Sequence, residues 1–217
     1  KITSLSPSHS PAAGGSEVAI TGSGFVDSGL MRCRFGEAVI VPKEVVGGTK
    51  IVCVAPAHAS GSVVVEVTNN NADYTSDGVK FEYEAVTRVF SVAPNSGPLS
   101  GGTVVALTGE NFGSKSLTCR FNTEEVAAIV SSSTAASCIS PKGSTTGFAT
   151  LEVSLNGVDF SRGGVKFEYI DDVEVTSVSP LTGPESGSTI VVVHGKNFVR
   201  SHLAACHFDS VSVPATF

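Results

Sequence analysis

The stretch APNSGPLSGGTVVALTGENF, residues 93–112, decides the fold because the same pattern occurs three times in this chain. It matches SPSHSPAAGGSEVAITGSGF at residues 6–25 and SPLTGPESGSTIVVVHGKNF at residues 179–198. The phenylalanines that end the three stretches are 87 and 86 residues apart. A fixed period of this length is typical of modules joined in tandem.

The matches continue on both sides of this stretch. CRF at 119–121 corresponds to CRF at 33–35 and CHF at 206–208, and FSRGGVKFEYI at 160–170 corresponds to YTSDGVKFEYE at 74–84. We therefore predict two complete repeats followed by the N-terminal half of a third. The predicted boundaries are residues 1–85, 86–171 and 172–217.

Within each repeat the apolar residues alternate with polar ones, which predicts strands and no long helix. Val105 and Leu107 alternate in TVVALTG, and Val165, Phe167 and Tyr169 alternate in GVKFEY. A period of two indicates antiparallel sheets with one buried and one solvated face. About seven short strands in fewer than 90 residues predict an all-β chain of immunoglobulin-like β-sandwiches. Linkers of about three residues, 84–86 and 171–173, predict an end-to-end arrangement with limited freedom.

The order P-x-x-G-P-x-x-G-G-T-x-V-x-x-x-G-x-N-F, then C-R-F, C-x-x-P and G-V-x-F-E-Y, resembles the IPT/TIG domain family. This family comprises immunoglobulin-like modules found in plexins, in fibrocystin-like surface proteins and in some Rel-type transcription factors. The resemblance covers nearly the whole chain. The chain lacks the basic recognition loop of the DNA-binding branch of this family, so it resembles the extracellular tandem arrays more closely. It implies a binding or spacer role and no catalysis.

The five cysteines predict the cell compartment. Cys33 and Cys53 are 20 residues apart, and Cys119 and Cys138 occupy the matching positions 19 residues apart. Equivalent pairs suggest one disulfide within each complete repeat, worth about 3 kcal/mol in a chain-entropy model, and hence an oxidising, extracellular setting. Buried free thiols are the alternative. A zinc site is disfavoured because no C-x-x-C pair occurs.

The last seventeen residues, SHLAACHFDSVSVPATF, gather Cys206 with His202 and His207. The repeat alignment places His207 where Arg34 and Arg120 lie, on the solvent side of a strand, which disfavours a metal site. Cys206 is the first cysteine of a pair whose second would fall beyond Phe217, so we expect it to be unpaired here or paired outside this segment. A half-sandwich exposes an open edge. We expect the chain to be a section of a longer protein, with strand addition by another chain as the alternative.

No catalytic, cofactor-binding or metal site is predicted. The two complete repeats contain only His9 and His58, which we place in solvent-facing loops, and no G-x-S-x-G motif occurs. The acidic pairs 124–125 and 171–172 are interpreted as solvated turn charges. The recurring Gly-Gly pairs open strands and are turn glycines rather than phosphate cradles.

Four aspartates near the predicted module ends are candidate calcium ligands. They lack the dense spacing of calcium-binding loops, so a calcium site is disfavoured. These residues are Asp27, Asp73, Asp77 and Asp159.

Composition limits the partners. Net charge is −6 and the 14 basic residues are scattered, which argues against nucleic acid, and no apolar run approaches the roughly 20 residues of a membrane span. No N-x-S/T acceptor occurs, while Ser/Thr-rich turns at 131–134 and 144–146 offer hydroxyls for O-glycans.

Repetition, short linkers and a charged fraction of 16% favour a non-enzymatic structural or adhesive module that self-associates in a fibre or array. A ligand-binding receptor ectodomain is the second hypothesis. An accessory module of a secreted carbohydrate-active enzyme is the third.

Overall fold

The computed structural model describes residues 1–113, 116–200 and 204–217, and the regular elements of this part are all β-strands. Repeat 1 contains β1 (Ile2–Ser6), β2 (His9–Pro11), β3 (Glu17–Gly22), β4 (Arg32–Phe35), β5 (Ala38–Ile40), β6 (Glu44–Val46), β7 (Lys50–Val54), β8 (Gly61–Thr68) and β9 (Lys80–Glu84). Repeat 2 contains β10 (Arg88–Ala93), β11 (Ser96–Pro98), β12 (Val104–Glu110), β13 (Leu117–Phe121), β14 (Glu124–Ser132), β15 (Ala135–Ile139), β16 (Gly147–Ser154) and β17 (Lys166–Ile170). The third repeat contributes β18 (Glu174–Ser179), β19 (Val192–Lys196), β20 (Ala205–Phe208) and β21 (Val211–Pro214).

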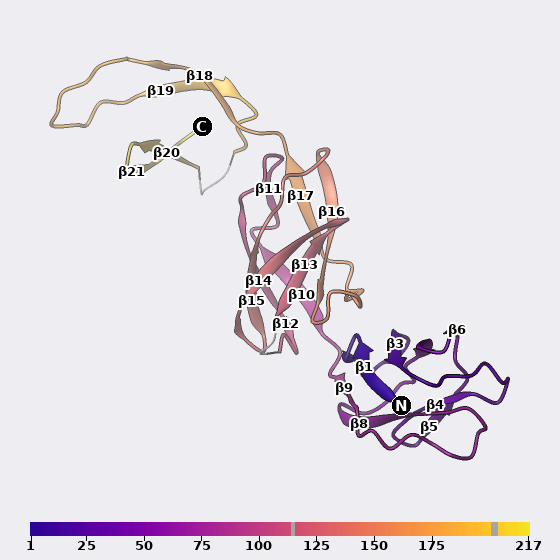
Figure 1. Ribbon diagram of the computed structural model, residues 1–217. Coiled ribbons are helices and arrows are strands. Elements are labelled where there is room, and N and C mark those ends of the chain that lie inside the picture. Colours follow the sequence, from indigo (N-terminus) through magenta and orange to yellow (C-terminus); the bar gives the residue numbers. More distant parts are fainter. Residues whose placement is uncertain (114–115, 201–203) are drawn as a thin grey trace.

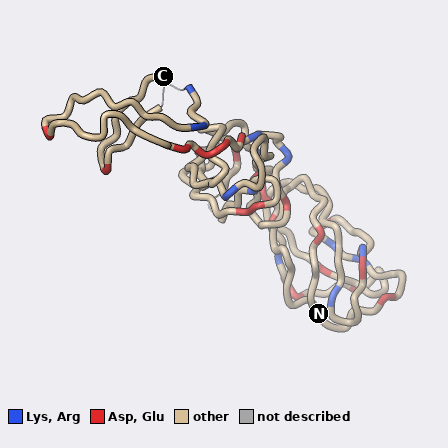
Figure 2. Tube along the Cα trace, turned by 90° about the horizontal axis from the view of Figure 1, so that it is seen from above, with Lys and Arg blue, Asp and Glu red and all other residues tan. Residues whose placement is uncertain are grey.

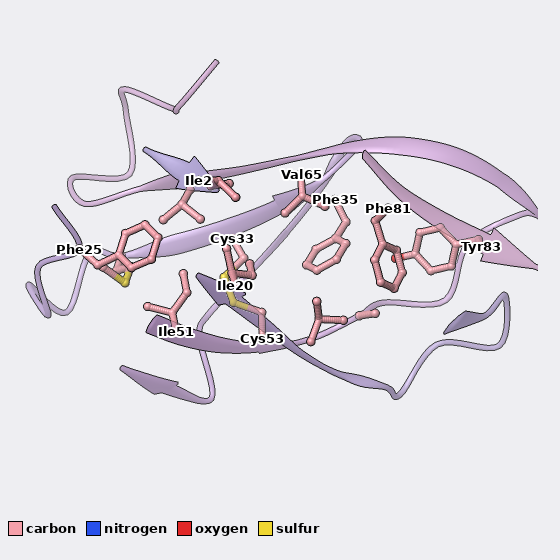
Figure 3. Packing of buried hydrophobic residues seen from close by; sticks show 14 residues of the cluster. Ile2, Ile20, Phe25, Cys33, Phe35, Ile51, Cys53, Val65, Phe81 and Tyr83 are labelled. Carbon is pink, nitrogen blue, oxygen red and sulfur yellow. A yellow bond between two sulfur atoms is a disulfide. The ribbon is translucent and has the colours of Figure 1, made fainter. Parts of the chain in front are cut away.

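Each complete repeat is a two-layer sandwich, as the alternation predicts. In repeat 1 the sheet β1-β3-β7-β6 packs on the sheet β2-β9-β8-β4-β5. The inward residues of both layers form one core, in which Phe35 and Phe81 meet edge to face with ring centroids 5.3 Å apart (Figure 3). In repeat 2, Val105 and Leu107 face the equivalent core and are 0% and 1% exposed.

The two sandwiches differ where one strand crosses between the layers. β14 of repeat 2 is continuous and pairs with both β13 and β15, which joins the two layers into one eight-stranded sheet. In repeat 1 the corresponding segment is divided into β5 and β6, with Pro42 between them. Proline has no N–H to donate to a strand ladder, so it interrupts the strand there.

A short parallel strand corrects the prediction of purely antiparallel sheets with about seven strands. After β1 and β10 the chain switches layers, and β2 and β11 pair in parallel with β9 and β17. Repeat 1 therefore has nine strands, and the described part of repeat 2 has eight. In repeat 2 this crossing requires Gly97, because a Cβ there would lie 2.2 Å from Thr103 Oγ1.

A glycine is needed in the T-G or H-G pair of the repeated stretch because a side chain there would clash with the backbone. A Cβ on Gly22 would lie 2.0 Å from the backbone oxygen of Lys1, and one on Gly109 would lie 2.0 Å from that of Arg88. The aromatic ring three residues later covers the other side, with Phe25 Cζ 2.6 Å from the Cβ position at Gly22. The first strand can therefore approach the third only where no side chain intervenes.

The two complete repeats lie end to end, and the third repeat follows as two separate hairpins, β18–β19 and β20–β21 (Figure 1). Several apolar side chains of the third repeat are exposed, including Ile190 at 86% and Phe208 at 49%. Acidic and basic residues are interspersed along both complete repeats (Figure 2). Within the described residues, no helix has the length and apolar character needed to cross a membrane.

Candidate functional site

The cysteines of repeat 1 form a disulfide. Cys33 in β4 is bonded to Cys53 in β7, with Cα atoms 6.7 Å apart. Because β4 and β7 belong to opposite layers, the bond ties the two sheets together inside the core (Figure 3). Both cysteines are fully buried.

The cysteines of repeat 2 occupy the matching positions in β13 and β15 but are free thiols in this structure. Cys119 and Cys138 are both buried and face each other across the core. A hydrogen bond to the Cys138 thiol, together with burial, raises the pKa of the Cys119 thiol above its ordinary value. The predicted second disulfide thus stays a prediction, with its two partners already in contact.

The described part of the C-terminal segment, residues 204–217, contains no cluster of metal ligands. Cys206 is a free, half-buried thiol in β20, and His207 beside it is exposed. His202 lies outside the described residues. Within the described ranges, no group of three His, Cys, Asp or Glu side chains could hold a metal ion.

Of the two histidines of repeat 1, only His9 differs from the prediction of solvent-facing loop residues, whereas His58 lies in an exposed loop as predicted. His9 lies in β2, and its Nδ1 is 3.1 Å from Oε2 of Glu84. His58 stacks on the ring of Tyr83 at a centroid distance of 4.9 Å. Burial raises the pKa of Tyr83 to about 12. The backbone oxygen of His9 in turn accepts a hydrogen bond from Asn156 of repeat 2.

The other carboxylates that could act as catalytic or calcium-binding groups lie on different parts of the chain. Glu124 and Glu125 are exposed at the start of β14. Asp172 accepts a hydrogen bond from the backbone N–H of Ser100 at 3.0 Å, which links the second linker to repeat 2. Asp77 accepts one from the N–H of Ile2 at 2.6 Å, within repeat 1.

Asp159 is the exception, because it joins two repeats. It belongs to a turn of six residues, 154–159, that follows β16 at the upstream end of repeat 2 (Figure 1). Its Oδ2 accepts a hydrogen bond of 2.7 Å from the hydroxyl of Ser16, and Nδ2 of Asn156 donates one of 3.0 Å to the backbone oxygen of His9. Ser16 is 2% exposed, so its hydroxyl is satisfied by the neighbouring repeat rather than by water.

The turn 154–159 is held in shape by hydrogen bonds between its own residues. Oδ1 of Asn156 accepts hydrogen bonds from the N–H groups of Val158 and Asp159, at 3.0 and 2.8 Å, which is the pattern of an Asx turn. Its Nδ2 also donates to Oδ2 of Asp159 at 2.8 Å. The carboxylate and the amide are therefore oriented toward repeat 1 before contact is made.

A cleft of about 880 Å³ opens beside this contact, between the two repeats. Its walls include Arg88, Phe90, Arg120 and Phe160. The guanidinium of Arg120 lies 3.6 Å from the ring centroid of Phe160 and donates to Glu152 at 2.6 Å. Arg120 therefore already has a carboxylate and a ring as partners at this junction.

The comparisons with known proteins agree with this architecture. The family model described as the IPT/TIG domain matches residues 1–83, 88–169 and 174–217. The chain belongs to the IPT/TIG family. The three matched segments correspond to three IPT/TIG repeats along the chain.

Curated relatives of these IPT/TIG repeats are plexins. The chain is 28% identical to Plexin-A3 of Homo sapiens over 221 residues, covering 92% of this chain and 11% of that protein. It is 29% identical to Plexin-2 of Caenorhabditis briggsae over 214 residues, covering 91% and 11%. The chain thus spans about a tenth of the length of the curated relatives it matches.

A solved structure of the full extracellular region of plexin A4, domains 1 to 10, has the same fold. The TM-score is 0.52 at 19% identity, over 97% of this chain and 19% of that one. Together with the plexin relatives and the family match, this makes the IPT/TIG chain an extracellular, cell-surface protein.

Sequence reasoning identified the cysteines but missed the turn 154–159 as a junction. It considered Asp159 only as a calcium ligand. A signal was present, because the pattern [ST]-x-N-x-x-D occurs at 68–73 and again at 154–159.

Proposed function

We propose that this chain is a non-catalytic spacer segment of a plexin-like receptor ectodomain, which holds its neighbours at a set distance and orientation. The observation that carries the proposal is the docked junction formed by Ser16, His9, Asn156 and Asp159, in a chain related to plexins over more than nine-tenths of its length. The plexin relatives favour the receptor hypothesis over the fibre predicted first from the sequence.

Two properties of the junction support this role. The chain passes from β9 to β10 through residues 85–87 alone, which leaves little slack. The two hydrogen bonds join residues that are 143 and 147 positions apart in the chain. They therefore constrain the relative orientation of the two modules directly. A protein partner is expected to bind along such a segment or beyond it.

Asp159→Ala is the test of this role. The substitution removes the acceptor for Ser16 and one partner of Asn156, and hydrogen bonds to a charged group contribute about 1.5–3 kcal/mol. We expect repeats 1 and 2 to move independently in the variant, seen by small-angle X-ray scattering as a broader distance distribution.

The control is Asp27→Ala, which removes an exposed carboxylate at the opposite end of repeat 1. It should leave the scattering profile of the parent unchanged. A parent profile that already fits freely jointed modules would refute the spacer role.

A second candidate, side-by-side association of two chains, is favoured by one face of repeat 2. On β12, β14 and β15 the residues Val104, Ile129 and Ile139 are 63%, 72% and 56% exposed, and Val104 pairs directly with Ile139. In repeat 1 the position of Val104 is held by Glu17, which pairs with Lys43. An uncharged face can meet its own copy without repulsion between like charges.

Ile129→Glu should abolish this association by placing a carboxylate on each of two facing sheets. Sedimentation velocity at increasing protein concentration measures it, with Phe148→Glu on the other layer, 66% exposed, as the matched control. A parent chain that stays monomeric at high concentration would exclude the second candidate.

A further inference from the structure

The two complete repeats carry the same turn at their upstream ends. In each turn a hydroxyl and two backbone N–H groups bond to the side-chain oxygen of an asparagine, whose amide bonds to an aspartate. In the first repeat these bonds are Thr68 Oγ1 to Asn70 Oδ1, 2.9 Å; the N–H groups of Ala72 and Asp73 to Asn70 Oδ1, 3.0 and 2.9 Å; and Asn70 Nδ2 to Asp73 Oδ2, 2.8 Å. We call residues 68–73 turn 1 and residues 154–159 turn 2.

Of these two turns, only turn 2 is bonded to a neighbouring repeat among the described residues. Asn156 and Asp159 of turn 2 are half-buried against repeat 1, whereas Asn70 and Asp73 of turn 1 are exposed. Within the described ranges, these two side chains form hydrogen bonds only inside turn 1. The two turns therefore have the same internal structure and differ in whether a neighbour is docked on them.

A hollow of about 230 Å³ lies beside turn 1. Its walls include Lys1, Gly24, Phe25 and Val67, in addition to Asn70 and Asp73. Several corresponding positions of repeat 2 line the junction cleft, namely Arg88 for Lys1, Val153 for Val67, Asn156 for Asn70 and Asp159 for Asp73. The upstream end of repeat 1 thus offers the surface that repeat 2 uses to hold repeat 1.

The group that docks on turn 2 recurs in every repeat. Ser16 follows Gly14 and Gly15, and the same position is held by Thr103 in repeat 2 and by Thr189 in the third repeat. The residue changes between Ser and Thr while the hydroxyl is retained. Each IPT/TIG repeat of this chain therefore carries the hydroxyl that can bond to a turn of this kind.

We propose that turn 1, with its hollow, is a docking site for the downstream end of another IPT/TIG repeat. The Ser or Thr hydroxyl of that repeat donates to Asp73, and a backbone carbonyl at the position of His9 accepts from Asn70. The occupant follows from turn 2, where repeat 1 itself is seated in this way. A cation fits less well, because Asp73 is the one carboxylate lining the hollow and Lys1 lies on its wall.

The experiment adds a second copy of residues 1–87 directly before Lys1 of the full chain. This reproduces the spacing between the repeats, since Lys1 corresponds to Arg88. Residual dipolar couplings then report whether two modules share one alignment. We expect the added repeat to align with repeat 1 in the same way as repeat 1 aligns with repeat 2.

In this fusion, Asp73→Ala in repeat 1 of the original chain should abolish the shared alignment of the added repeat. Ser76→Ala in the same repeat, at an exposed position outside the turn, should preserve it. An added repeat that tumbles independently, or an Asp73→Ala fusion that keeps the alignment, would overturn the proposal. So would calcium added to the 217-residue chain, if it shifted the resonances of Asn70 and Asp73 as a bound ion does. The alignment between repeats 1 and 2 is measured in the same sample, so failure at turn 1 alone leaves the spacer role intact.

Discussion

Replacing Cys33 and Cys53 together by alanine is expected to lower the free energy of unfolding of repeat 1 by about 3 kcal/mol. The disulfide closes a segment of 20 residues, and in the chain-entropy model its loss lets the unfolded chain explore many more conformations. A module of some 86 residues has a net stability of about 4–13 kcal/mol, so the loss is a large share of the total. Repeat 2 should be unaffected because its core is separate.

Calorimetry of the full chain measures this effect as a fall in the melting temperature of one transition out of two. Because both alanines also remove buried sulfur, the parent chain with its disulfide chemically reduced gives the entropic part alone. An unchanged transition for repeat 1 in both samples would mean that the bond does not stabilise the module.

The Cys119→Ala, Cys138→Ala double variant gives the comparison within repeat 2. We propose that these two thiols are joined in the secreted protein, since they occupy the positions of the bonded pair and are already in contact. Peptide mapping without reduction tests the bond directly. Two free thiols in protein secreted through an oxidising compartment would exclude it.

The layers of the sandwich could be predicted from the sequence because they depend on local alternation. Phe167 and Tyr169 point inward and Lys166 points outward, as the period of two requires. The presence of two equivalent cysteines per repeat also predicted the bond that the structure shows in repeat 1. These features need only the residues of one strand or one repeat.

The features that escaped prediction depend on groups distant in sequence. The parallel pairing of β2 with β9 requires the chain to switch layers, and alternation within three residues carries no sign of that. The contact of Ser16 with Asp159 depends on how two modules are placed relative to each other. The division of the corresponding strand in repeat 1 is different, because Pro42 is a local signal of it that sequence reasoning missed.

Phe167→Ala is expected to have the largest effect in repeat 2, a loss of about 3–5 kcal/mol in the free energy of unfolding. Phe167 is 0% exposed, and its ring meets those of Phe121 and Tyr169 edge to face or nearly so, at centroid distances of 5.4 and 5.2 Å. Truncation leaves a cavity that a two-layer sandwich cannot close, because both layers are held by hydrogen-bonded strands. A loss of this size can exceed the whole stability of the module.

Phe148→Ala is the matched control for this prediction, since it removes the same ring from the same repeat. Phe148 in β16 is 66% exposed and pairs with Glu168, the residue after Phe167, so only the direction of the side chain differs. Its truncation should change the stability of repeat 2 by no more than about 0.5 kcal/mol. Urea unfolding of both variants, followed by the exchange of amide hydrogens in β16 and β17, separates repeat 2 from repeat 1. Equal losses for the two variants would show that the inward orientation of Phe167 is wrong, and with it the register of β17 on which the core of repeat 2 depends.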